Sequence, residues 1–283
     1  MKRVAITGAS GFVGKSLQHY FEGVGMESIS IPRSALSDRT KLVEMIDGCE
    51  VIINLAGASI IGRWSESYKE LLYHSRIDTT QVLVDAMQRC SKKPELFIST
   101  SAVGIYPQDR AYTEDDTQLG DDFLANLCKS WESEALKANE LGIRTAIFRF
   151  GIVLGKDGGA LSKMMTPFKL GVGGVIGDGS QAFSYIHIDD LIAAYAHIIE
   201  HKQLDGVFNL TAPTPTTNRG LTKALGNHLG RPTILPLPAF VLKLLLGEGA
   251  SVLTEGQTVL PKRLLDSGFV FEYDTIEKAI ESL

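Results

Sequence analysis

The sequence predicts an α/β protein built on a doubly wound parallel sheet, with a smaller lobe attached. Short runs of β-branched and apolar residues alternate with helix-length amphipathic segments from the first residue onward. The strand runs are almost entirely apolar, as is typical of strands that are buried on both faces. Strands are therefore expected at residues 3–7, 28–31, 51–54, 96–99, 144–149 and 207–210.

Long connections follow three of these strands, those that end near Asn54, Ser99 and Arg149. In an open α/β sheet such strand ends border the ligand crevice, so long loops at these ends indicate a functional role. Helices cover the sheet in this arrangement, and the amphipathic segments predict them at residues 14–24, 38–46, 67–90, 121–141 and 189–201.

The second half of the chain is expected to contain a smaller lobe. Glycines crowd residues 155–179 and prolines interrupt residues 213–238, a composition that is typical of loops. The glycine-rich loop within this lobe is expected to close over the crevice. We predict a first domain over residues 1–154, completed by 183–211, and a substrate lobe from residues 155–182 and 212–283.

Charge and cysteine usage narrow the class of protein. The 283 residues carry a formal net charge of −5, which gives no broad attraction to nucleic acid or to anionic lipid. Small molecules are therefore the expected partners. Three cysteines without a C-x-x-C pair indicate reduced thiols and no metal site. We expect no signal peptide and no membrane-spanning stretch, and the predicted location is the cytoplasm.

The strongest local signal follows the first strand, in Thr7-Gly8-Ala9-Ser10-Gly11-Phe12-Val13-Gly14. Gly8 allows a tight turn, Gly11 lets the backbone approach a pyrophosphate, and Gly14 lets the helix pack against the strand. The helix N-terminus then offers free N–H groups and a favourable dipole to the phosphates. This context predicts a Rossmann-type dinucleotide site, with contacts from Thr7, Gly8, Ser10, Gly11, Phe12, Val13 and Gly14.

The end of the second strand distinguishes between the two dinucleotides. A carboxylate there binds the adenosine ribose and repels a 2′-phosphate, whereas an arginine does the reverse. The chain reads Ile29-Ser30-Ile31-Pro32-Arg33-Ser34, without an acidic residue. Arg33 can pair with a phosphate through its planar fork of donors, so NADP is the predicted cofactor. The alternative is that Arg33 is an ordinary surface residue.

On these motifs the sequence resembles the extended short-chain dehydrogenase/reductase superfamily over essentially its whole length. Asn54-Leu55-Ala56-Gly57 is similar to the turn beside the adenine ribose, and Ser99-Thr100-Ser101-Ala102-Val103 to the strand end with the catalytic serine. Two later motifs fall at residues 149–155 and 184–190. The resemblance implies a catalytic role for Ser101 and cofactor contacts from Leu55, Ala56, Gly57, Ser99 and Arg149.

More narrowly, the chain resembles an atypical branch of that superfamily, the epimerase family proteins, which are similar to sugar-nucleotide epimerases. The stretches that carry this resemblance are Arg63-Trp64, Ser75-Arg76-Ile77, Ser101-Ala102-Val103-Gly104, Leu127-Cys128-Lys129-Ser130-Trp131-Glu132, Gly155-Lys156-Asp157-Gly158-Gly159-Ala160-Leu161 and Gly256-Gln257-Thr258-Val259-Leu260-Pro261.

The chain departs from the superfamily where a tyrosine and a lysine, four residues apart on one helix, perform acid–base work. Aligning the helix on its glutamate, Glu132, puts Leu124 and Cys128 at the two positions. Shifting by one residue recovers Lys129 but puts Ala125 at the tyrosine position. Both alignments lack the pair, and the superfamily's helix asparagine falls at Arg76.

Two functional interpretations stay open. In the first, the chain is an NADP-dependent oxidoreductase or epimerase-like enzyme that acts on a small polar, anionic substrate. Ser101 and Tyr106 would then be catalytic, and Arg63 and Arg76, with Lys69 nearby, would bind the substrate. In the second, it is a non-catalytic NADP(H)-binding redox sensor or scaffold protein. By resemblance, a homodimer is expected through the helices at 67–90 and 121–141.

Overall fold

The central sheet is parallel and joins strands from both halves of the chain. The computed structural model describes residues 2–156 and 158–283; Asp157, in the motif at residues 155–161, lies outside the described residues. Within them the sheet has six strands in the order β2-β1-β3-β4-β6-β9, which confirms the predicted fold class. Their bounds are β1 (Arg3–Thr7), β2 (Glu27–Ile31), β3 (Val51–Asn54), β4 (Leu96–Ala102), β6 (Arg144–Phe150) and β9 (Gly206–Leu210).

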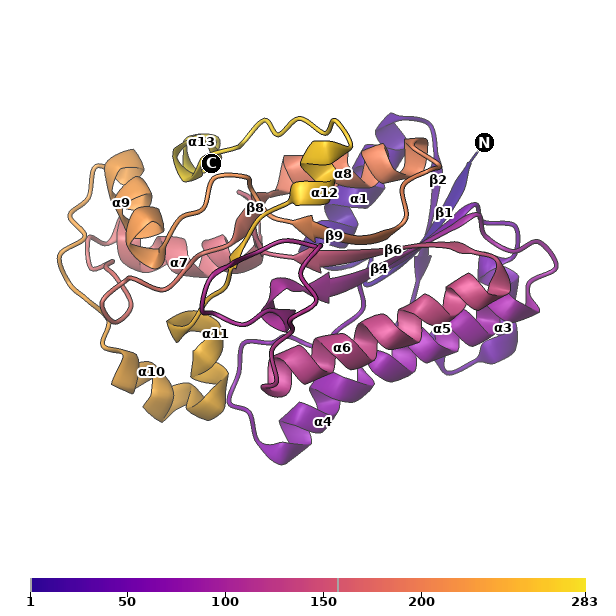
Figure 1. Cartoon of the computed structure of the whole chain (residues 1–283), viewed down its shortest axis with the longest axis horizontal. Coiled ribbons are helices and arrows are strands. Elements are labelled where there is room, and N and C mark those ends of the chain that lie inside the picture. The colour runs from indigo at the N-terminus through magenta and orange to yellow at the C-terminus, as the bar shows by residue number, and fades with distance from the viewer. Residues whose placement is uncertain (1, 157) are drawn as a thin grey trace.

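Helices cover both faces of this sheet (Figure 1). Val4 and Ile6 of β1 pack into the core under α1 (Phe12–Gly23) and α8 (Ile188–Glu200). Ala5, between them, packs into the opposite core. Side chains alternate between the faces of a strand, so an all-apolar strand serves two cores at once. The second face is covered by α3 (Arg39–Ile46), α5 (Ile77–Arg89) and α6 (Phe123–Leu136).

The strand order places the glycine loop at the point where the sheet reverses its direction of growth. β1 pairs with β2 on one side and with β3 on the other. Open α/β sheets bind ligands outside the carboxyl ends of the strands at such a switch point. The turn from β1 into α1 and the loop after β3 therefore border the same crevice.

The single helix predicted over residues 67–90 is wrong, because the chain forms α4 (Glu66–His74) and α5 with a break between them. At the break, the Ser75 hydroxyl accepts a hydrogen bond from Ala58 N at 3.0 Å. The Arg76 guanidinium donates to Ala58 O at 3.0 Å. Both residues turn toward the loop after β3 and satisfy its backbone, which the amphipathic pattern alone does not reveal.

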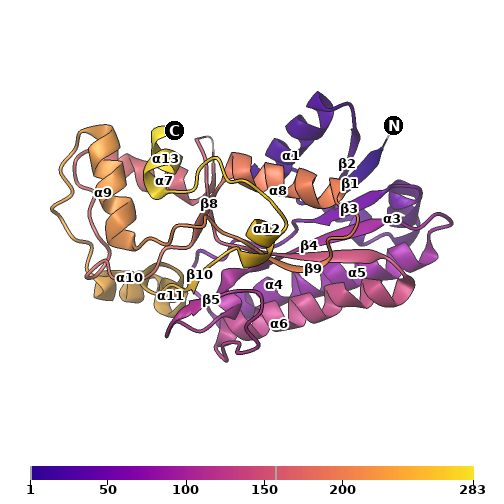
Figure 2. The ribbon, with the colours of Figure 1, turned by 45° about the horizontal axis from the view of Figure 1, so that its top comes forward.

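A smaller lobe stands beside the sheet and has a core of its own (Figures 1 and 2). Leu154, Phe168, Leu221 and Ile280 belong to this core. The strand that completes the main sheet is β9, whereas β8 (Tyr185–His187) pairs with β7 (Ile152–Leu154). Other elements are α2 (Arg33–Leu36), α7 (Gly159–Lys169), α9 (Asn218–Leu229), α10 (Ala239–Leu246), α11 (Ser251–Thr254), α12 (Lys262–Asp266), α13 (Ile276–Glu281), and the paired β5 (Ala111–Tyr112) and β10 (Thr258–Val259).

One segment of the predicted lobe packs against the main sheet instead. Leu264 of α12, with Phe269 and Phe271 after it, lies in the core under α1 and α8. The Arg263 guanidinium stacks 4.6 Å from the ring centroid of Phe208 on β9. β9 is an edge strand, and α12 covers it, which is a common protection of sheet edges.

α10 exposes apolar side chains, with Phe240 71% and Leu244 76% exposed.

None of the helices in the described part of the chain has the length and apolar character needed to cross a membrane.

Candidate functional site

A cavity of about 1180 Å³ opens at the carboxyl ends of β1, β3 and β4, between the sheet and the small lobe. The glycine loop and the loop after β3 line one end, and α6 lines a side wall. The lobe closes the opposite wall with residues from α11 and the segment after it. Ile176, from the glycine-rich loop 171–179, also lines the cavity, so that loop borders the crevice as expected.

The glycine loop has a geometry that only glycine allows. Gly8 has φ of 67°, and a Cβ there would lie 2.8 Å from Leu55 O. A Cβ at Gly14 would lie 2.5 Å from Gly8 O. The first-turn N–H groups of a helix have no intrahelical partner. In α1 no side chain of the N-cap residue, Gly11, bonds to them. The loop therefore fits the pyrophosphate of a dinucleotide.

The remaining residues of the predicted motif support the loop or flank it. The buried Thr7 hydroxyl donates to Asn54 Oδ1 at 2.7 Å and accepts from Leu55 N at 3.2 Å. This links the glycine loop to the turn Leu55-Ala56-Gly57, which lines the cavity. Phe12 and Val13 line it too, whereas Ser10 is exposed and outside the lining.

Arg33 begins α2 at the end of β2 and is exposed. The register pairs Thr7 with Ile31, so the end of β2 lies directly beside the glycine loop. A 2′-phosphate on a ribose bound there would be within the region that Arg33 can reach.

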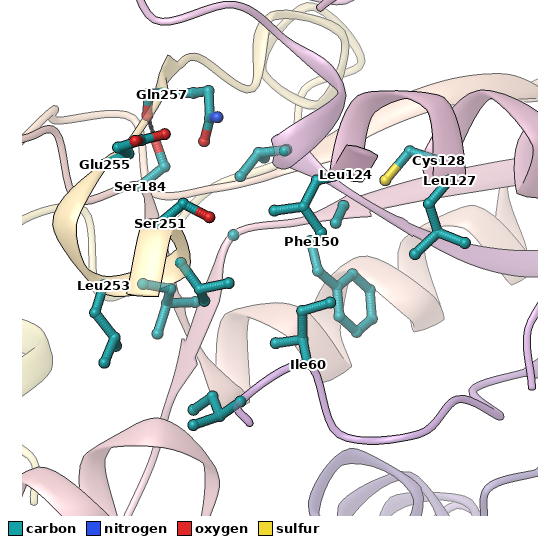
Figure 3. A pocket seen from close by; sticks show the side chains of 18 of the residues that line it. Ile60, Leu124, Leu127, Cys128, Phe150, Ser184, Ser251, Leu253, Glu255 and Gln257 are labelled. Atoms are coloured by element: carbon teal, nitrogen blue, oxygen red, sulfur yellow. Dashed lines mark hydrogen bonds between the residues drawn. The ribbon is translucent and has the colours of Figure 1, made fainter. Parts of the chain in front are cut away.

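α6 presents apolar and thiol groups to the cavity (Figure 3). Leu124 and Cys128 both line it, while Ala125 is buried and lies outside the lining. Lys129 Nζ donates to Asn126 Oδ1 at 3.3 Å on the exposed side of the helix. The geometry therefore favours the alignment with Leu124 and Cys128 at the tyrosine and lysine positions. Burial, together with the charge of Glu132, raises the pKa of Cys128 to about 11, so the thiol keeps its proton at neutral pH.

Ser101 lines the cavity and is held from behind by a buried ion pair. Its Oγ donates to Glu132 Oε1 at 2.6 Å. Arg149 donates to both oxygens of this carboxylate, at 2.8 Å from Nε and 2.7 Å from a terminal nitrogen. Burial by itself lowers the pKa of Arg149, but the bonds and charge of Glu132 outweigh it and raise the value. The pair fixes the direction of the serine hydroxyl.

Tyr106 lies behind this pair and outside the cavity lining, with 1% of its surface exposed. Its hydroxyl accepts from Arg149 at 2.6 Å and donates to Asn209 Oδ1 at 3.0 Å. Its ring stacks on Tyr112, with 5.4 Å between centroids. Burial raises the pKa of the phenol. Tyr106 is thus in reach of Arg149 rather than of a ligand in the cavity.

Ser99 is also fully buried, two residues before Ser101.

The three cations near the break between α4 and α5 have different surroundings. Arg63 is exposed and outside the lining. Lys69 lines the cavity but is paired with Glu248 at 2.5 Å. Arg76 is half-buried, lines the cavity and makes no ion pair with any carboxylate of residues 2–156 and 158–283.

The sequence alone did not identify Glu132 as the partner of Ser101, although the position of Glu132 on its helix indicates a buried carboxylate. Leu124, Cys128 and Glu132 follow one another at intervals of one helical turn, so they share a face of α6. A carboxylate on such a buried face requires a partner. The opposite wall, seen in Figure 3, was also missed. It carries Ser184, Ser251, Glu255 and Gln257, from segments whose approach only the folded lobe reveals.

Comparison with known proteins extends over the whole chain. The profile of the NAD dependent epimerase/dehydratase family matches residues 4–211, and DUF1731, a domain of unknown function, matches residues 237–283. Epimerase family protein SDR39U1 from Mus musculus is 36% identical over 291 residues, covering 99% of each chain. Epimerase family protein SERP0438 from Staphylococcus epidermidis is 36% identical over 296 residues, covering 100% of this chain and 99% of the relative.

Solved structures agree with this relationship. The crystal structure of human epimerase family protein SDR39U1 (isoform 2) with NADPH has a TM-score of 0.91 and 32% identity, covering 99% of this chain and 98% of that chain. UDP-glucose 4-epimerase of Thermus thermophilus, in complex with NAD, has a TM-score of 0.78 at 17% identity, covering 99% and 98%, which supports the fold alone. The predicted resemblance to an atypical, epimerase-like branch of the extended short-chain dehydrogenases is thereby confirmed, and the chain belongs to the NAD dependent epimerase/dehydratase family.

Proposed function

We propose that this chain binds NADP(H) and transfers hydride between the nicotinamide and a small polar substrate. The glycine loop, the Leu55-Ala56-Gly57 turn and the exposed Arg33 beside it support the cofactor assignment. The NADPH bound to the human relative supports the same choice. NADP(H), when bound, supplies or accepts the hydride.

The extent of the cavity supports a catalytic function. It continues from the glycine loop past Ser101 into a chamber between α6 and the small lobe. One wall of this chamber is apolar, with Leu124 and Leu127, and the facing wall offers the polar groups of Ser251 and Gln257 (Figure 3). A chamber of this composition suits a small molecule with several hydrogen-bonding groups.

Ser101 is the proposed contact to the reacting oxygen of the substrate. Because its own proton is donated to Glu132, its lone pairs can accept a hydroxyl hydrogen from a substrate. When that hydroxyl gives its proton to Ser101 Oγ, the serine proton passes to Glu132 Oε1, and reduction runs the same path backwards. Arg149 holds the carboxylate in place and Tyr106 holds Arg149. Tyr106 is therefore proposed as a positioning residue.

A turnover assay tests this proposal. The protein is incubated with NADPH and a panel of carbonyl metabolites and sugar nucleotides, with cofactor absorbance and product mass as readouts. Turnover should be lost in Ser101→Ala and kept in Ser130→Ala, a serine of α6 outside the cavity lining. Equal activity of both variants on a turned-over substrate would contradict the role of Ser101.

A non-catalytic NADP(H)-binding sensor or scaffold is the second candidate, and the lining of α6 favours it. Leu124 and Cys128 stand where the superfamily has its tyrosine and lysine, and no tyrosine is among the described residues that line the cavity. Loss of that pair removes an acid–base contribution of about 10²–10⁴-fold in rate. Silence across the whole panel, with NADPH binding intact, would support this candidate over the enzyme.

A homodimer through the predicted helices at 67–90 (α4 and α5) and 121–141 (α6) stays a prediction. α5 and α6 pack against each other on one face of the sheet. Light scattering at micromolar concentration tests it, and a monomer there would contradict it.

A further inference from the structure

Arg76 is a half-buried cation whose charge is not neutralised by the described part of the chain. Its hydrogen bonds go to neutral groups, namely Leu72 O at 3.2 Å, Ala58 O at 3.0 Å and Ser75 Oγ at 3.4 Å. None of the described residues accepts a hydrogen bond from its Nε. Burial lowers the pKa of the guanidinium, since removing a charge from water without a partner is unfavourable. An anionic ligand in the cavity would relieve this cost.

The surroundings of Arg76 indicate which part of the cavity its guanidinium faces. Its Cζ lies 3.1 Å from where a Cβ on Gly57 would stand, so it covers the last residue of the turn after β3. Two residues earlier, the same turn touches the glycine loop, with Leu55 O against Gly8. On the other side, Arg76 lies 5.3 Å from the ring centroid of Trp131 on α6, and its charge acts on the Cys128 thiol. Arg76 therefore stands between the glycine loop and the α6 wall beside Ser101.

The substrate chamber has cations of its own, Lys69, which is paired with Glu248, and Lys243. Its facing wall is otherwise polar through hydroxyl and amide groups and Glu255. Glu255 itself accepts from Gln108 at 3.0 Å. A dinucleotide with its pyrophosphate at the glycine loop and its nicotinamide at Ser101 would instead pass the free donor of Arg76, which lies near Cys128 and Trp131 of α6.

We infer that Arg76 binds the nicotinamide half of the cofactor, through its phosphate and ribose hydroxyls, rather than the substrate. This inference rests on the proposed binding of NADP(H). A guanidinium suits both groups, because its planar fork donates to phosphate oxygens and to hydroxyls alike. Arg33 would then hold the 2′-phosphate end of the dinucleotide and Arg76 the opposite half.

Binding of a whole and a truncated cofactor separates these two ends. NADPH and adenosine 2′,5′-bisphosphate, which lacks the nicotinamide half, are titrated by calorimetry into the wild-type protein and its variants. Arg76→Gln should weaken NADPH roughly ten- to hundredfold, the usual cost of a lost charged contact. The affinity for the bisphosphate should stay unchanged, which also shows that the variant is folded. Arg33→Ala should weaken both ligands.

Two further variants complete the design. Arg76→Lys keeps the charge and should recover part of the NADPH affinity, while Arg63→Gln, an exposed arginine outside the lining, should alter neither ligand. Equal losses for both ligands in Arg76→Gln would assign the residue a purely structural role, and no loss for either would exclude the contact. If the wild-type protein binds neither ligand, the proposed function itself fails, and the inference with it.

Discussion

The glycine loop and helix α6 form two walls of one cavity, yet they contribute to it in different ways. The loop acts through its backbone, and its glycines are required by approaches of 2.5 and 2.8 Å that no side chain would allow. α6 acts through side chains, and it offers Leu124 and a protonated Cys128. A backbone site depends on a few glycines alone, whereas a side-chain site changes with each substitution. The glycine loop thus has the geometry that fits a dinucleotide, whereas α6 carries Leu124 and Cys128 where the resemblance implies a tyrosine and a lysine.

The carboxylate of Glu132 on α6 lies behind the cavity lining. Glu132 follows Cys128 by one turn and bonds Ser101 and Arg149 instead of a ligand.

The buried ion pair should dominate the stability of the α6 wall. Glu132→Ala leaves Arg149 buried without its partner, which typically costs about 3–5 kcal/mol. Urea unfolding of the variant measures this loss. Lys137→Ala, which removes the pair between Glu134 of α6 and the exposed residue that ends this helix, is the matched control and should change stability little. Similar unfolding midpoints for the two variants would contradict the structural role of Glu132.

The glycine loop should respond to a single added methyl group. A Cβ at Gly14 would meet Gly8 O at 2.5 Å and Ala9 Cα at 2.6 Å, both of them backbone. Gly14→Ala should therefore cost about 1–3 kcal/mol and abolish NADPH binding. Gly23→Ala, at the other end of α1, meets no atom within 4 Å and should stabilise the helix by about 0.5–1 kcal/mol. NADPH binding that survives Gly14→Ala would contradict the role of the glycine-loop backbone in binding the cofactor.

Cys128 should behave as a core thiol rather than a reactive one. Its pKa in the folded protein is about 11, above the ordinary 9.0, so the folded state holds the proton more tightly than the unfolded chain. Its contribution is complete below about pH 9 and is lost as pH rises toward 11. Cys128→Ser should flatten the fall in unfolding free energy over that interval. Rapid alkylation of this thiol at neutral pH would instead indicate a reactive thiolate at the cavity.

The strands, the glycine loop and the two candidate alignments of α6 could be predicted, because they follow from local patterns. The apolar runs fixed β1 and β3 at their observed bounds. Three features could not be predicted in this way: the break at Arg76, the burial of Tyr106 and the pairing of Lys69. Arg76 interrupts a helix to reach Ala58, 18 residues away in sequence. The buried Tyr106 hydroxyl donates to Asn209, 103 residues distant, and Lys69 is neutralised by Glu248 of the small lobe. Each depends on a partner that only the fold brings near.

A cofactor titration tests the proposed NADP(H) site most directly. NADPH and NADH are titrated into the wild-type protein and Arg33→Ala, with cofactor fluorescence as the readout. We expect saturable NADPH binding that Arg33→Ala weakens roughly ten- to hundredfold, with NADH affinity nearly unchanged. Equal losses for the two cofactors, or no binding of NADPH to the wild-type protein, would contradict it.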